Sequence, residues 1–145
     1  MMVSLSETNE LIRSARQAMS MAYCPYSKFP VGCALLCQDG TIITGCNVEN
    51  SAYPSSICAE RTAFVKAISM GQKKFKAVAV VTNLPNEFCA PCGQCRQFMS
   101  EFGCDLIVIL TKPNGEHQIH SLKELLPHSF GPNDLKTYNE SMTNA

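Results

Sequence analysis

The sequence has no excess of charge of either sign and no long apolar run. Its 145 residues carry 12 Lys+Arg and 12 Asp+Glu, so the formal net charge at pH 7 is zero. No basic stripe or like-charge run stands out, which argues against a nucleic-acid partner, because phosphate binding requires clustered Lys and Arg. The longest aliphatic runs, residues 77–81 and 106–110, are far too short to cross a bilayer, so we expect no membrane partner.

We also expect no secretory signal, because charged side chains from Glu7 to Arg16 interrupt the first 22 residues and leave no apolar signal core. The protein is therefore expected in the cytoplasm. In a reducing compartment its nine cysteines serve as metal ligands, catalytic groups or small buried side chains more often than as disulfides. The three histidines all lie after residue 116. His117 and His120 could bind a metal, but we expect them to be exposed at strand ends.

Alternating helix and strand patterns predict an α/β fold in a single domain, residues 1–145, with residues 1–5 and 134–145 loose. The apolar fraction of 46% is ample for one packed core. Ser4 and Glu7 have capping-box spacing, and Asp39-Gly40 predicts a hairpin. Helices are expected at residues 4–22, 57–70, 91–103 and 121–126, and strands at 31–38, 41–48, 76–83, 105–111 and 116–120.

Three thiols and one carboxylate fall near the predicted starts of two helices. Cys58 and Glu60 lie in the first turn of one helix. Pro91 suits the first position of the other, which puts Cys92 and Cys95 on one helix face. A helix N-terminus lowers a thiol pKa toward the thiolate that a metal needs. Three ligands with a fourth position left for water, and an acid beside them, are typical of a catalytic zinc site.

The neighbours of these residues allow other interpretations. Cys89 could complete a closed four-cysteine structural site, but such a site has no use for Glu60. Arg61 could donate to a coordinating sulfur, because three thiolates on Zn²⁺ leave one net negative charge, or it could form a surface ion pair. Ser55 or Ser56 is expected to cap the helix that carries Glu60 and Arg61.

Two segments before this helix could contact a ligand. Asn47 and Glu49 are two apart, so on an extended chain they point the same way and could hold a pair of hydroxyls. Residue type alone favours a solvated loop instead. Phe29 follows a proline-rich loop and could stack on a flat base, although residue type alone favours a core aromatic.

The chain resembles the small homotetrameric cytidine deaminases of pyrimidine salvage over residues 22–132. The pattern of a Cys, a Glu two residues on, and a later Pro-Cys-x-x-Cys is that of zinc nucleobase deaminases. Four motifs in order and a Leu-Leu-Pro…Phe-Gly-Pro tail carry the resemblance. They are Ala22-Tyr23-Cys24-Pro25-Tyr26-Ser27, Asn47-Val48-Glu49-Asn50, Cys58-Ala59-Glu60-Arg61-Thr62, Pro91-Cys92-Gly93-Gln94-Cys95-Arg96-Gln97, and the tail at residues 125–132.

The resemblance implies a three-layer α/β/α fold around a five-stranded mixed sheet. It implies zinc-dependent hydrolytic deamination of cytidine and 2′-deoxycytidine to uridine and 2′-deoxyuridine, with release of ammonia. It also implies a homotetramer whose sites are completed by neighbouring subunits. The resemblance implies one Zn²⁺ per subunit, held by Cys58, Cys92 and Cys95, with Arg61 beside the metal and Glu60 as the proton shuttle. The implied substrate contacts are Phe29, Asn47, Glu49, Ser51, Tyr53, Ala59 and Phe130. Of these, Tyr53 and Phe130 are expected near the site of a neighbouring subunit.

Three alternatives stay open. A deaminase of blasticidin-type antibiotics would share the cysteine motifs, but we would not expect the Asn47/Glu49 pair there. A polynucleotide deaminase fits poorly with the balanced charge and the short chain. A zinc-stabilised binding module without activity would have no use for Glu60 or for an open fourth position.

Overall fold

A computed structural model describes residues 2–143. The elements are α1 (Leu5–Met19), β1 (Val31–Cys37), β2 (Ile42–Cys46), the 3-10 helix η1 (Tyr53–Ser55), α2 (Ala59–Ser69), β3 (Phe75–Thr82), α3 (Gly93–Ser100), β4 (Ile107–Thr111), β5 (His117–Ser121), α4 (Leu122–Leu125) and α5 (Pro132–Thr143). None of the helices in this described part is both long and apolar enough to cross a membrane.

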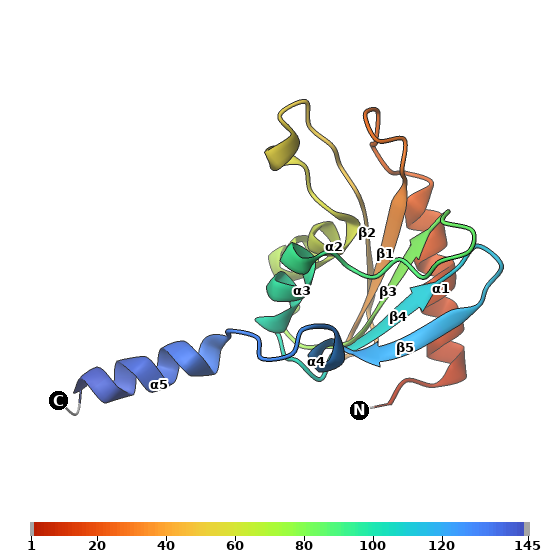
Figure 1. Ribbon diagram of the computed structural model, residues 1–145. Coiled ribbons are helices and arrows are strands. Elements are labelled where there is room, and N and C mark those ends of the chain that lie inside the picture. The colour runs from red at the N-terminus through yellow and green to blue at the C-terminus, as the bar shows by residue number, and fades with distance from the viewer. Residues whose placement is uncertain (1, 144–145) are drawn as a thin grey trace.

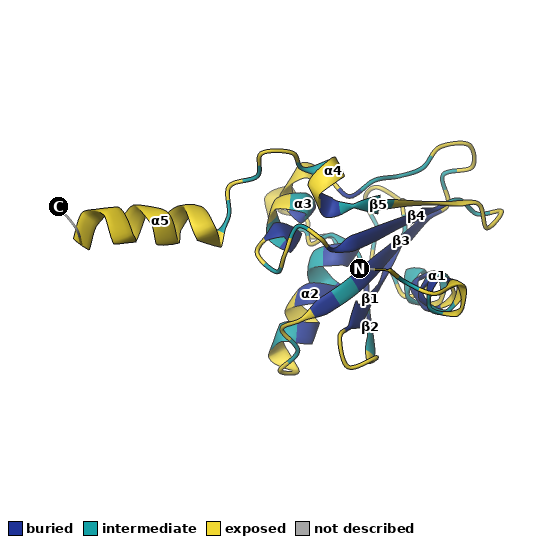
Figure 2. Ribbon diagram, turned by 90° about the horizontal axis from the view of Figure 1, so that it is seen from below, coloured by how far each residue is buried: buried dark blue, intermediate teal, exposed yellow. Residues whose placement is uncertain are grey.

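The five strands form one mixed sheet in the order β2-β1-β3-β4-β5. β3 and β4 run parallel, and every other neighbouring pair is antiparallel. Helix α1 covers one face of the sheet, and α2 and α3 cover the other (Figures 1 and 2). The predicted three-layer α/β/α fold around a five-stranded mixed sheet is therefore confirmed.

Each face of the sheet packs into its own apolar core. Side chains alternate along β1, so that Cys33 and Leu35 face α2 and α3 while Ala34 and Leu36 face α1. The middle of β3 is buried on both faces, as its unbroken apolar run predicts. The sheet thereby holds the helices of the two faces in a fixed relation to one another.

Both helices that carry the thiols begin later than the sequence predicts. The chain around Ser56 and Ile57 stays extended, because Ile57 pairs with the backbone of Val48, and the N-cap of α2 is Cys58 instead of Ser55 or Ser56. The N-cap of α3 is Cys92, so Pro91 precedes the helix. Two of the three thiols, those of Cys58 and Cys92, therefore belong to N-cap residues.

Residues near both termini, which were expected to be loose, have regular local structure in the described part of the chain. Ser4 caps α1 in the predicted capping box, so Leu5 already starts that helix. Residues 132–143 form α5, which begins at Pro132, and Asp134 accepts from the N–H of Gly131 at 2.7 Å. All residues of α5 are exposed, and the helix projects away from the sheet (Figure 1). Residues 1, 144 and 145 lie outside the described part.

Gly45 on β2 permits the close approach of α2. A Cβ at this position would lie 2.5 Å from the N of Ala63 and 2.6 Å from the O of Ala59. Both are backbone atoms of α2, and they cannot move aside as the end of a flexible side chain can. Because Ala59 adjoins Cys58, the fit at Gly45 also locates the first thiol.

We expect Gly45→Ala to lower the free energy of unfolding by about 1–3 kcal/mol, the usual cost of overpacking a core. Gly131→Ala is the matched control, because a Cβ there meets nothing within 4 Å. Chemical denaturation of both variants measures the difference. Equal stability of the two variants would contradict the role assigned to Gly45.

Candidate functional site

Three thiols converge where α2 and α3 begin. Cys58 and Cys92 are the N-caps of the two helices, and Cys95 lies one turn into α3. The three Sγ atoms all lie within 4.8 Å of one another, and those of Cys58 and Cys92 are 3.9 Å apart. Ligands at about 2.3 Å from a tetrahedral zinc are roughly 3.8 Å from each other. The thiols therefore fit zinc, and Cys89 is not in the cluster found among residues 2–143.

The surroundings favour thiolate at Cys58. A hydrogen bond from the Cys95 thiol, together with the Arg61 guanidinium, lowers the pKa of Cys58 to about 5. The same hydrogen bond raises the pKa of Cys95, so in the metal-free cluster the proton stays on Cys95. The positive end of each helix adds to this preference for negative charge.

Glu60 lies beside the thiols in the first turn of α2 and is only 4% exposed. Burial raises the pKa of this carboxyl to about 7, and the negative charge at Cys58 contributes. A carboxyl group that titrates near neutral pH can both accept and donate a proton. A divalent cation on the thiols would favour its charged form.

Arg61 turns back toward the cluster. Its Nη2 lies 3.8 Å from the Sγ of Cys58 and 3.5 Å from the carbonyl O of Ser56. Its Nε is buried and has no hydrogen-bond partner among residues 2–143. The structure thus places the guanidinium at a thiol and not in a surface ion pair.

Asn47 and Glu49 hold the loop that precedes β1. Asn47 accepts from the N–H of Val31 at 2.8 Å and donates to the carbonyl of Phe29 at 2.9 Å. Glu49 Oε1 accepts from the N–H groups of Tyr26 and Ser27 at 3.0 and 3.1 Å. These bonds join loops 23–30 and 47–57, which rise from the same end of the sheet (Figure 1). The two side chains are therefore ordered by the backbone and not solvated freely.

These loops enclose a pocket of about 310 Å³, lined by Tyr26, Ser27, Glu49, Tyr53 and Ser56. The rings of Tyr26 and Tyr53 meet edge to face, with centroids 5.8 Å apart. The pocket offers aromatic and carboxylate surface together, which suits a small polar ligand with a flat ring.

The remaining predicted contacts differ in exposure. Phe29 is 38% exposed at the end of loop 23–30, and Ser51 is exposed on loop 47–57. Ala59 is fully buried, so a contact between it and a ligand would require the site to open.

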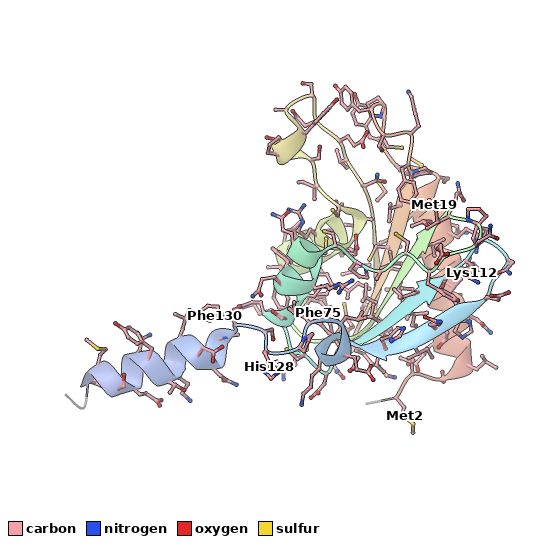
Figure 3. All side chains as sticks on the ribbon, in the orientation of Figure 1. Met2, Met19, Phe75, Lys112, His128 and Phe130 are labelled. Atoms are coloured by element: carbon pink, nitrogen blue, oxygen red, sulfur yellow. The ribbon has the colours of Figure 1, made fainter. Side chains whose placement is uncertain are left out.

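Phe130 lies apart from the other predicted site residues. It is 58% exposed and lies just before the N-terminus of α5 (Figure 3). It lines a separate groove of about 630 Å³ with residues of α3 and α5, and this groove shares no residue with the pocket around Glu49. Within one chain the structure does not bring Phe130 to that pocket.

Sequence reasoning missed the main-chain donors of the site. The N–H groups of Tyr26 and Ser27 hold Glu49, but residue identity carries no signal for a backbone contact across 22 or 23 positions. Pro25 and Pro30 indicated only that the helix ends and a loop follows.

Known proteins share both the sequence and the fold. A family model described as the cytidine and deoxycytidylate deaminase zinc-binding region matches residues 5–111. A cytidine deaminase of Sporosarcina psychrophila is 49% identical over 131 residues, which is 89% of this chain and 95% of the relative. A probable cytidine deaminase of Dictyostelium discoideum is 47% identical over 129 residues, covering 89% of this chain and 87% of the relative.

Among solved structures, a 1.6 Å crystal structure of cytidine deaminase from Burkholderia pseudomallei superposes with a TM-score of 0.81 at 45% identity. The match covers 84% of this chain and 98% of that one. The matched segment 5–111 contains all three thiols and Glu60. The chain therefore belongs to the family of cytidine and deoxycytidylate deaminases that share this zinc-binding region.

Proposed function

We propose that the protein catalyses the zinc-dependent hydrolytic deamination of cytidine and 2′-deoxycytidine to uridine and 2′-deoxyuridine, with release of ammonia. The observation that carries the proposal is a buried carboxyl group, Glu60, beside three thiols that fit zinc and leave a fourth position. Cys58, Cys92 and Cys95 are the proposed ligands of one Zn²⁺ per subunit. A purely structural zinc site would need a fourth ligand and no acid.

Glu60 is the proposed proton shuttle. A zinc ion held by Cys58, Cys92 and Cys95 would lower the pKa of a bound water to about 7 and so make hydroxide available at neutral pH. Glu60 accepts the proton of the attacking water and passes it to N3 of the base, which makes C4 electrophilic. Glu60 then takes the remaining proton from the hydroxyl group now on C4 and delivers it to the amino group, so that the C4–N bond breaks, C4=O forms and ammonia leaves. Arg61 would offset part of the negative charge of the thiolates.

Loops 23–30 and 47–57 form the proposed nucleoside site. Asn47 and Glu49 would hold the ribose hydroxyls, with Ser51 and Ala59 as further contacts. Phe29 would stack on the base. Apart from the buried Ala59, these residues are at least partly exposed and lie on loops 23–30 and 47–57 at one end of the sheet, which supports the assignment. Because Glu49 Oε1 already accepts two main-chain bonds, the loop is ordered before a ligand binds.

We further propose a homotetramer in which Tyr53 and Phe130 reach a neighbouring subunit's site. Tyr53 is 70% exposed and Phe130 is 58% exposed, so both rings are accessible to a second subunit. Phe130 is also remote from its own chain's pocket.

The proposed setting is pyrimidine salvage in the cytoplasm. All nine cysteines are free thiols, and metal-binding thiols require a compartment that keeps them reduced.

Glu60→Gln should keep one zinc per chain and lose at least about 10²–10⁴-fold in kcat for cytidine, because the acid–base group is gone. The fall in cytidine absorbance measures turnover, and atomic absorption measures zinc. Glu10→Gln, an exposed carboxylate on α1, is the control and should behave as wild type. Near-normal turnover in Glu60→Gln would refute the mechanism.

Free cytosine should react more slowly than cytidine, by as much as roughly 10⁴–10⁵-fold in kcat/KM, because Asn47 and Glu49 would lose their hydroxyl partners. Glu49→Gln keeps a side-chain oxygen that can accept from the N–H groups of Tyr26 and Ser27. This variant should have a higher KM for cytidine, so its kcat/KM values for cytidine and cytosine should differ less than those of wild type. Parallel assays on the two substrates test the assignment. Equal rates on both in wild type would remove the ribose role from Asn47 and Glu49.

Phe130→Ala should lower kcat/KM for cytidine by up to about tenfold, the value of one aromatic contact. Subunits of Phe130→Ala and Glu60→Gln, dissociated and reassembled together, should regain activity, because one supplies Glu60 and the other supplies Phe130. Each variant reassembled alone is the control. If the mixture shows no more activity than the two controls, Phe130 does not act across subunits.

A further inference from the structure

Arg96 is a half-buried cation on α3 whose guanidinium binds two main-chain carbonyls. Its Nε donates to the carbonyl O of Pro91 at 2.7 Å, and its Nη1 donates to the carbonyl O of Leu125 at 2.8 Å. Both distances are short for N–H···O bonds, as is usual when the donor is charged.

The first bond acts on Cys92, the thiol that follows Pro91. The main-chain N–H of Arg96 also donates to the carbonyl O of Cys92 at 3.0 Å. The peptide planes before and after the Cα of Cys92 are therefore both held by Arg96. Few other constraints act on this thiol, because Cys92 is exposed and its side chain makes no capping bond. Cys95, in contrast, is fully buried.

The second bond holds the guanidinium itself in place. Leu125 is the last residue of α4, and the final carbonyls of a helix lack partners within it. Arg96 supplies one of the missing donors. The neighbouring side chain, Gln97, holds the same C-terminal segment further along, since its Nε2 donates to the carbonyl O of Phe130 at 2.9 Å.

We propose that Arg96 is a positioning residue of the metal centre, which fixes the backbone of Cys92 so that its Sγ meets the other two thiols. The inference takes only the identity of the metal, zinc, from the proposed function. A guanidinium suits this task because its donors lie in one plane at fixed angles. The single ammonium group of a lysine would reach one of the two carbonyls at a time.

The test is zinc affinity, measured by competition with a chromogenic chelator in the absence of nucleoside. We expect Arg96→Met to bind zinc about 10–100-fold more weakly, the usual effect of removing a group that orients a metal ligand. Arg96→Lys should fall between Arg96→Met and wild type. The visible spectrum of the Co²⁺-substituted protein should change in Arg96→Met, because the position of one thiolate changes.

Two controls separate this role from a general loss of structure. Arg13→Met removes an exposed arginine of α1 that pairs with Glu10, and it should bind zinc as wild type does. Gln97→Met loosens the C-terminal segment without touching Pro91, so it should also keep wild-type zinc affinity. Weak zinc binding in Gln97→Met would assign the effect to that segment and overturn the proposal.

Wild-type zinc affinity in Arg96→Met would likewise overturn the proposal that Arg96 positions Cys92. If circular dichroism shows that Arg96→Met does not fold, Arg96→Lys decides, and zinc affinity equal to wild type in that variant refutes the proposal. Because zinc binding is measured without cytidine, a wild-type protein that binds zinc but does not deaminate cytidine would refute the proposed function alone.

Discussion

The site depends on the convergence of two helix N-termini on one point. Cys58 and Cys92 cap these helices, and each N-terminus carries about half a positive charge. The Sγ atoms of Cys58 and Cys92 are 3.9 Å apart, and two negative charges at that distance would repel one another without this field, the nearby Arg61 and a cation between them. The close approach of α2 to Gly45 and the crossover from β3 through α3 to β4 bring the two ends together.

The same burial that makes Glu60 useful for chemistry makes it costly for folding. Removing a carboxylate from water disfavours its charged form, which is why the pKa of Glu60 rises to about 7. A metal on the neighbouring thiols would offset that cost, since it would add positive charge to that of Arg61. Metal binding and stability are therefore linked in this protein, and the charge state of Glu60 depends on both.

Polar side chains connect loop 47–57 to loop 23–30. Asn47 and Glu49 bind main-chain groups of loop 23–30, so the pocket has a defined shape before any ligand enters. In contrast, Tyr53 and Phe130 leave large aromatic surfaces exposed at separate places. The structure thus combines an ordered pocket within one chain with aromatic side chains that a second subunit could use.

The sequence by itself determined what local patterns encode. The capping box at Ser4, the hairpin at Asp39-Gly40 and the spacing of Cys92 and Cys95 all depend on residues a few positions apart. Tertiary structure alone decided where distant groups meet. Helix α2 starts only at Ala59, with Cys58 as its N-cap, because Ile57 pairs with Val48. Arg96 reaches a carbonyl 29 positions away. Such contacts depend on how whole elements pack, and no periodicity along the chain records that packing.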